Sequence, residues 1–191
     1  EGMGFYEAGA RADVRNDACF DESLTLVAFW LAVDAPRCWV PAETAPLVLR
    51  AQALLAAALV GLAEHACDLA VTYAKVREQF GSPIGGFQAV KHRCADMAVR
   101  QRLAWCQTSL ACLKLEAGAA DAALQVASAK LLAAEAAHEN GRACVQLHGG
   151  IGVQAECDAH GFLKRARVYD QAGGDFERQA GVVARAAAPG W

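Results

Sequence analysis

Residues 76–90 read VREQFGSPIGGFQAV and separate two long alanine-rich stretches that have helical periodicity. Helix-forming residues give way within a few positions to Gly81 and Pro83. Glycine favours a left-handed C-cap, and proline cannot continue the helix that precedes it. Apolar residues recur every three to four positions from Phe87 onward. We therefore predict a helix that ends near Phe80 and a second that begins at about Phe87, joined as a helical hairpin.

Arg77 lies at the corner of this hairpin. A basic residue at a helix C-terminus stabilises the helix dipole, typically by about 0.3–1 kcal/mol. From composition alone, that structural role is the simpler interpretation of Arg77.

The rest of the chain continues the helical pattern. We predict helices at about residues 46–79, 87–117, 120–147, 155–170 and 175–187, with glycines after most of them. Four long helices with short connections predict an all-α fold, an up-down four-helix bundle with an extra C-terminal helix. The first helix has little polar surface, so we expect it to be buried on several sides and not only by the next helix.

Residues 1–43 differ in kind, because apolar residues alternate there with acids and arginines, and prolines mark the exit. They predict a short irregular or β N-terminal arm with one or two strands. The domain prediction is thus an arm at 1–43 and a bundle at 44–191.

Composition argues against several classes of protein. A net charge of -3 and a pI near 6.0 predict no nucleic-acid partner and no anionic membrane partner. The apolar run at 24–33 is too short to cross a bilayer. The eight cysteines stand singly, which predicts reduced thiols on apolar helix faces and a cytoplasmic protein.

The charged and histidine positions add little by themselves. The five histidines have no partner at ligand spacing, so no metal site is expected. His92 and Asp96 are four residues apart and predict an exposed ion pair. A basic run at Lys164, Arg165 and Arg167 is typical of a solvated helix face.

The letters of the hairpin carry more information. Arg77, Phe80, Gly81, Ile84 and Gln88, preceded by Tyr73 and followed by Ala95-Asp96-Met97, closely resemble the hairpin of the acyl-CoA dehydrogenase family. The segments QLHGGIG at 146–152 and RARVY at 165–169 match the same family in the same order. The resemblance covers about residues 45–187, which correspond to the family's C-terminal helical domain, and makes the arm a remnant of its β-domain.

The resemblance implies an enzyme that uses FAD and an acyl-CoA thioester. A carboxylate removes the proton α to the thioester carbonyl while the β-hydride passes to the flavin. Arg77 would bind the FAD pyrophosphate, and Gln79 and Phe80 would flank the cofactor. Gln146 and Gly150 would approach its adenine end. In the family these groups reach a flavin held mainly by the neighbouring subunit.

The catalytic carboxylate is where the resemblance fails. The match places Gly173 at the position of the usual glutamate, and the alternative position, near Ala51, has no acid within several residues. Nearby carboxylates are displaced by two or more positions: Asp170, Asp175 and Glu177.

Three hypotheses follow. The leading one is an acyl-CoA dehydrogenase-like subunit without its own base, in a homo- or hetero-oligomer with another acyl-CoA dehydrogenase-like chain. Family members of this split kind are associated with CoA thioesters of bulky lipids such as sterol side chains. The second is a non-catalytic assembly protein that has kept the bundle. The third is a fragment of a longer enzyme, which the starting Glu1 permits.

Overall fold

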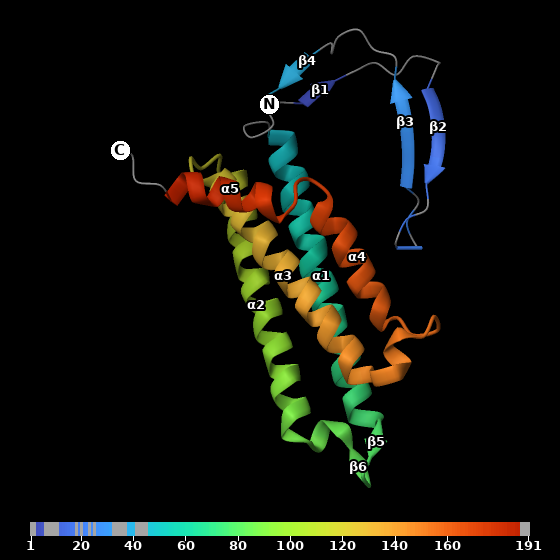
Figure 1. Cartoon of the computed structure of the whole chain (residues 1–191). Helices are drawn as coiled ribbons and strands as arrows, with labels where there is room; N and C mark the ends of the chain where they lie inside the picture. Colours follow the sequence, from blue (N-terminus) through green and yellow to red (C-terminus); the bar gives the residue numbers. More distant parts are fainter. Residues whose placement is uncertain are drawn as a thin grey trace.

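The bundle predicted from the sequence is confirmed. The computed structural model describes residues 3–5, 12–17, 19, 21–22, 24, 26–31, 38–40 and 46–187. Helices α1 (Pro46–Val76), α2 (Gln88–Glu116), α3 (Ala122–His148) and α4 (Ala159–Gln171) run alternately up and down, and α5 (Phe176–Ala187) lies at one end (Figure 1).

Helix α3 is the centre of the bundle, because it contacts α1, α2, α4 and α5. Its buried face is mostly alanine, and the facing positions of α1 are alanine as well. Such small side chains bring the helix backbones close together, and dispersion contacts then accumulate over the whole length. Helix α1 packs against α2, α3 and α4, so the expectation that it has several neighbours is confirmed.

Helix α1 is also long and apolar enough to cross a membrane by length and composition alone, over Leu47–Val76. The core helix of a water-soluble bundle passes the same test. Within this chain, only 39% of the most apolar 18-residue stretch of α1 is buried. The described part of the chain therefore leaves much of the apolar surface of α1 uncovered.

The hairpin differs from its prediction. Helix α1 ends at Val76 and not near Phe80, and a two-stranded turn follows, formed by β5 (Glu78–Gln79) and β6 (Ser82–Pro83). The short 3₁₀ helix η1 (Ile84–Gly86) then leads into α2. Gly81, with φ 79°, sits in the strand-to-strand turn and does not cap the helix.

The end of α3 shows a second difference. Gly149, with φ 62°, is the C-cap that the glycine cluster predicted. A 3₁₀ helix, η2 (Gly149–Val153), follows it, so α4 begins at Ala159 and not at residue 155. Gly152 is required by packing, since a Cβ there would lie 2.7 Å from the Val145 carbonyl oxygen.

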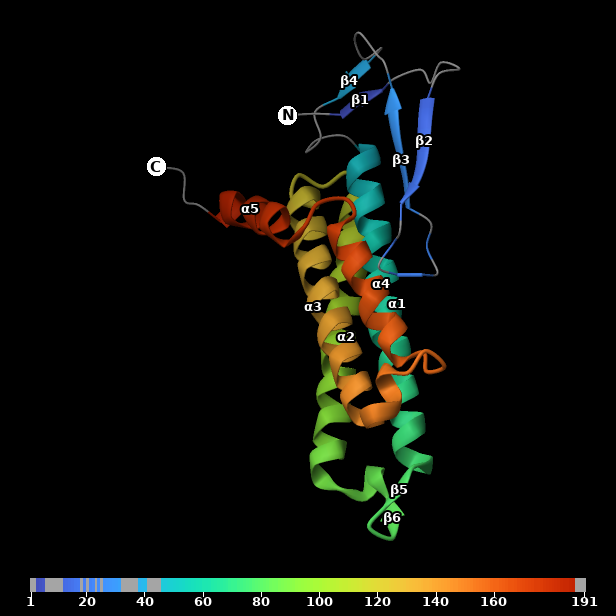
Figure 2. The ribbon, with the colours of Figure 1, turned by 45° about the vertical axis from the view of Figure 1, so that its right-hand side comes forward.

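The arm has more strands than the one or two predicted. Strand β1 (Met3–Phe5) pairs antiparallel with β4 (Cys38–Val40), and β2 (Ala12–Asp17) pairs with β3 (Leu26–Leu31). Figure 2 shows the β2–β3 hairpin beside the bundle.

Ion pairs between described residues join the arm to α4. Asp21 Oδ2 accepts a 2.5 Å hydrogen bond from Arg165 Nε, and Lys164 Nζ lies 3.6 Å from Glu22 Oε1. The basic run is therefore not simply a solvated face. The hydrogen bond that Arg165 donates to Asp21 raises the pKa of Arg165, which keeps this pair ionised.

The cysteines of the described part of the chain are all free thiols, as predicted. Cys67 and Cys144 are buried, whereas Cys106 and Cys112 are exposed and so depart from the expected core position. Cys38 lies in β4, and its side chain is outside the described residues.

Candidate functional site

The two sequence motifs meet at the end of the bundle where α1 and α3 finish. The Tyr73 ring of α1 stacks on the His148 ring of α3, with ring centroids 4.1 Å apart and planes inclined by 24°. His148 Nδ1 donates a 2.8 Å hydrogen bond to the Cys144 carbonyl oxygen, which fixes the tautomer and the ring plane. This stack sets the position of the β5–β6 turn relative to the glycine cluster.

Arg77 lies one residue beyond α1. Its backbone N–H donates to the Tyr73 carbonyl over 2.8 Å, and its carbonyl accepts from Ile84 N–H over 2.8 Å. Its side chain is exposed, and no carboxylate of the described residues pairs with it. The backbone is thus held in place while the guanidinium group remains available to a ligand.

Phe80, at the tip of the β5–β6 turn, combines two unfavourable features. It has φ 54°, a left-handed conformation that bulky residues rarely adopt, and it is 94% exposed. Its only described ring neighbour is Phe87, edge-on with centroids 6.2 Å apart. Strained residues that persist at a surface are concentrated at ligand contacts and switches. Gln79 lies beside it, exposed, and donates to the Glu78 carbonyl over 2.7 Å.

Gly150 differs from the glycines on either side of it. It has no left-handed φ, and a Cβ added there would meet nothing within 4 Å, whereas Gly149 is a C-cap and Gly152 is closely packed. The fold therefore gives no reason for glycine at position 150. The open space beside Gly150 leaves room for the cofactor that the sequence predicts at this position.

Gln146 is exposed on α3 and lines a groove of about 460 Å³ between α2 and α3. Sequence reasoning missed three arginines of this groove: Arg93, Arg100 and Arg142. Arg93 and Arg100 are seven residues apart in α2, and Arg142 lies four residues before Gln146 in α3. This spacing places each pair on one helix face, so it could have predicted a common groove.

Two of these arginines are engaged inside the chain. Arg100 donates to Asn140 Oδ1 over 2.7 Å, and Arg142 pairs with Glu139 at 2.9 Å. His92 and Asp96 also line the groove, but within the described structure they do not form the predicted ion pair.

The turn at Gly173 lies toward the opposite end of α3. Gly173 has φ 72° and Gly174 has φ 108°. The Gly173 carbonyl accepts a 2.7 Å hydrogen bond from Gln52 Nε2 of α1, and a Cβ at this position would lie 2.9 Å from Leu55 Cδ1. Since Gln52 follows Ala51, the two positions considered for a catalytic base are neighbours in space.

The acids near this turn have structural partners. Asp170 is buried, with Oδ2 3.4 Å from His138 Nε2. Asp175 Oδ1 accepts from the backbone N–H of Arg178 over 3.1 Å, which is an N-cap of α5. Glu177 is exposed in the first turn of α5.

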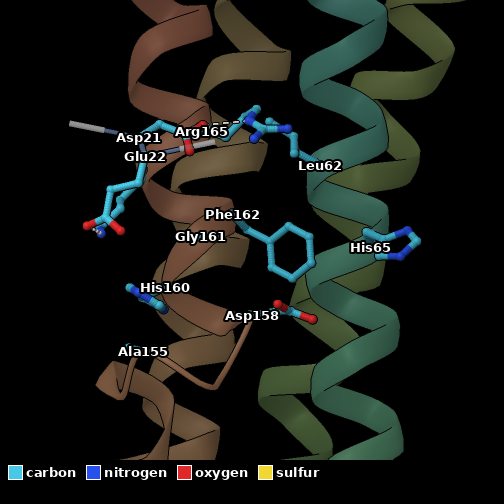
Figure 3. Close-up of a pocket in the computed structure, with 11 residues that line it drawn as sticks. Asp21, Glu22, Leu62, His65, Ala155, Asp158, His160, Gly161, Phe162 and Arg165 are labelled. Carbon is cyan, nitrogen blue, oxygen red and sulfur yellow. Dashed lines mark hydrogen bonds and ion pairs between the residues drawn. The ribbon is translucent and has the colours of Figure 1, made fainter. Parts of the chain in front are cut away.

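A further pocket, of about 450 Å³, lies between the arm, α1 and α4 (Figure 3). Its acids and bases compensate one another, as in the pair of Asp21 with Arg165, and the rings of His65 and Phe162 lie 5.8 Å apart. It contains none of the predicted cofactor residues. In the part of the chain that the structure describes, no group of three or more histidine, cysteine or acidic residues could hold a metal ion.

Known proteins support the resemblance seen in the sequence. The family described as acyl-CoA dehydrogenase, C-terminal domain, matches residues 48–188. Acyl-CoA dehydrogenase FadE34 of Mycobacterium tuberculosis is 45% identical over 121 residues, 61% of this chain and 16% of that protein. Acyl-CoA dehydrogenase IpdE2 of the same organism is 44% identical over 113 residues, 59% of this chain and 34% of that protein.

Solved structures agree with this match. A putative acyl-CoA dehydrogenase from Mycobacterium smegmatis has a TM-score of 0.82 at 26% identity, over 92% of this chain and 49% of that one. A variant of the Tcur3481–Tcur3483 steroid ACAD has a TM-score of 0.81 at 26% identity, over 93% of this chain and 50% of that one. The chain thus spans about half the length of these structures. Since the family match extends over most of the bundle, the chain belongs to the acyl-CoA dehydrogenase family and carries its C-terminal helical domain.

Proposed function

We propose that this chain contributes part of an FAD site to an acyl-CoA dehydrogenase that it forms with a second acyl-CoA dehydrogenase-like chain. The observation that carries the proposal is the β5–β6 turn. It presents a strained, 94% exposed Phe80 beside Arg77, which no described carboxylate neutralises. The strain and exposure of Phe80 do not stabilise an isolated bundle, and the two side chains together suit a bound anionic, aromatic cofactor.

Each predicted residue has a role in this site. The guanidinium fork of Arg77 binds pyrophosphate oxygens, for which its planar donors are suited. Phe80 and Gln79 cover the cofactor, and Gln146 and Gly150 border its adenine end, where position 150 offers open space. Bound FAD supplies the hydride acceptor of the α,β-dehydrogenation.

The proton acceptor comes from the partner. Position 173 has no side chain, Asp170 is paired with His138, and Asp175 caps α5. A base must reach the proton it removes within hydrogen-bond distance, so neither of these two engaged carboxylates suits the role.

The partner covers an apolar surface between α1 and α2. A groove of about 530 Å³ runs there, and its neighbourhood exposes Leu54 at 71% and Leu113 at 65%. The Thr108 hydroxyl lines this groove, buried and without a hydrogen-bond partner among the described atoms. An exposed apolar patch of this kind is typical of protein interfaces, so light scattering should find an oligomer and not a monomer at micromolar concentration.

The proposed substrate is a CoA thioester of a bulky lipid. One solved relative is a steroid ACAD, and this proposal for the present chain rests on that likeness.

The experiment is co-expression with a longer acyl-CoA dehydrogenase chain from the same source. The proposal predicts little FAD on this chain alone, FAD retained in the complex, and flavin reduced by an acyl-CoA. In the complex, amide replacements of the acids near the turn should leave reduction intact: Asp170→Asn, Asp175→Asn and Glu177→Gln.

Two results would contradict the proposal. A fall of about 10²–10⁴-fold for one amide variant at unchanged flavin content would show that this chain carries its own base. A stable complex without FAD would instead favour a non-catalytic assembly protein, for which the missing side chain at Gly173 is the supporting observation.

A further inference from the structure

Lys130 of α3 is a buried cation that neither motif includes. It is 1% exposed, and it is the largest of the fully buried residues in the described part of the chain. Lysine is almost never fully buried unless its ammonium group is bound. The partners of Lys130 therefore require an explanation.

The ammonium group of Lys130 binds the end of α4 and the turn beyond it. Its Nζ donates to the carbonyl oxygens of Asp170 at 2.9 Å, Ala172 at 3.0 Å and Gly174 at 3.3 Å. A protonated lysine has three N–H donors and no acceptor, so three carbonyls use all of its donors. Two of these carbonyls belong to the C-terminus of α4, where a positive charge is favourable.

Two opposing effects act on the pKa of the Lys130 ammonium group. Burial lowers the pKa of Lys130, and the negative charges of Asp170 and Asp175 oppose this change. A neutral amine would offer only two donors to the three carbonyls. The geometry of the site fits the protonated form.

Neutral side chains complete the arrangement. Gln52 of α1 donates to the Gly173 carbonyl over 2.7 Å, and Gln179 of α5 donates to the Gly173 and Gly174 carbonyls over 3.3 Å each. Side chains from three helices thus hold a turn whose two glycines both have positive φ. Lys130 alone among them is charged and reaches both the end of α4 and the far side of the turn.

We propose that Lys130 is the positioning residue of the 172–174 turn, which it holds in a fixed conformation although Gly173 has no side chain. Its hold on the turn follows from the contacts above. Its importance for catalysis rests on the proposed function: the resemblance places position 173 where the family has its base, so the turn would border the reacting acyl group, and a fixed backbone there would keep the thioester aligned with the partner's base.

The first test concerns the turn alone and uses the full chain. Lys130→Met keeps the apolar stem and removes the ammonium group, and the exposed Lys91→Met is the matched control. Two amides report on the turn, because Ala172 N–H donates to Val168 and Gln179 N–H donates to Asp175, each over 3.1 Å. Their hydrogen exchange should accelerate roughly tenfold or more in Lys130→Met only.

Two outcomes of this test would overturn the proposal. Unchanged exchange at these amides would show that the turn does not depend on Lys130. Equal acceleration throughout α3 and α4 would show that Lys130 is only a packing residue of the bundle.

A second measurement needs no variant and so holds even if Lys130→Met fails to fold. Nitrogen-15 NMR of the lysine side chains of the unchanged protein should find one slowly exchanging ammonium signal at neutral pH, assigned to Lys130. A neutral amine signal for this residue would contradict the assignment of three donated hydrogen bonds.

The catalytic role is tested in the assembled complex. Lys130→Met should slow flavin reduction by an acyl-CoA about tenfold or more at unchanged FAD content and subunit ratio, while Lys91→Met should not. Equal rates in the two variants would refute the catalytic role. If the unchanged complex does not reduce its flavin, the proposed function fails, and the exchange and NMR results still decide whether Lys130 holds the turn.

Discussion

The glycine cluster at the end of α3 allows a structural glycine to be separated from a ligand-facing one. A Cβ at Gly152 would lie 2.7 Å from the Val145 carbonyl oxygen and 3.0 Å from His148 Cβ. Because the first of these atoms is backbone, Gly152→Ala requires the end of α3 to shift, and overpacking of this kind costs about 1–3 kcal/mol. At Gly150 a Cβ meets nothing within 4 Å. Gly150→Ala should therefore raise the free energy of unfolding by about 0.4–1 kcal/mol, because alanine restricts the conformations of the unfolded chain.

Urea unfolding followed by circular dichroism measures both changes. The urea concentration at the unfolding midpoint should fall for Gly152→Ala and stay the same or rise for Gly150→Ala. The slope of the unfolding free energy against urea concentration should not change in either variant. In the assembled complex, Gly150→Ala should then lose FAD although its bundle is intact. Equal midpoints for the two variants would refute the packing argument, and full FAD retention by Gly150→Ala would refute the role of this position at the cofactor.

Three further predictions follow from other residues. Arg77→Ala should weaken FAD retention in the complex by about 1.5–3 kcal/mol, the range for hydrogen bonds to a charged group; unchanged retention would leave Arg77 as a helix-dipole residue. Burial raises the pKa of the Cys144 thiol from 9.0 to about 12, so folding stability should be fully present below pH 9 and decline as pH rises toward 12, which thermal melts across that range would detect. At pH 8 a thiol reagent should label the exposed Cys112 but not Cys144 in the folded chain; rapid labelling of Cys144 would contradict its burial.

The helices were predictable because they depend on local periodicity and on glycine and proline signals. The exact end of α1 was not, since Glu78 and Gln79 are good helix formers by propensity. What stops the helix is a bond between Ile84 N–H and the Arg77 carbonyl, which closes the β5–β6 turn. The local sequence pattern does not predict such a bond, because the bond depends on the path of the chain after the turn.

The candidate site divides in the same way. The family resemblance implied that Arg77 and Gln146 approach the same cofactor, and the stack of Tyr73 on His148 brings the two motifs together at one end of the bundle. The burial of Lys130 could not be foreseen, because a lysine in an alanine-rich helix usually faces solvent. Its acceptors lie 40 or more residues later in the chain.

Helix α3 also separates the turn that Lys130 contacts from the proposed cofactor surface near His148. Lys130 and His148 are 18 positions apart on a helix, which corresponds to about 27 Å at 1.5 Å per residue. Changes at sites this far apart add nearly independently in free energy. A substitution at the Lys130 end of α3 should therefore leave the proposed cofactor surface at the His148 end unchanged, and each end can be altered without changing the other.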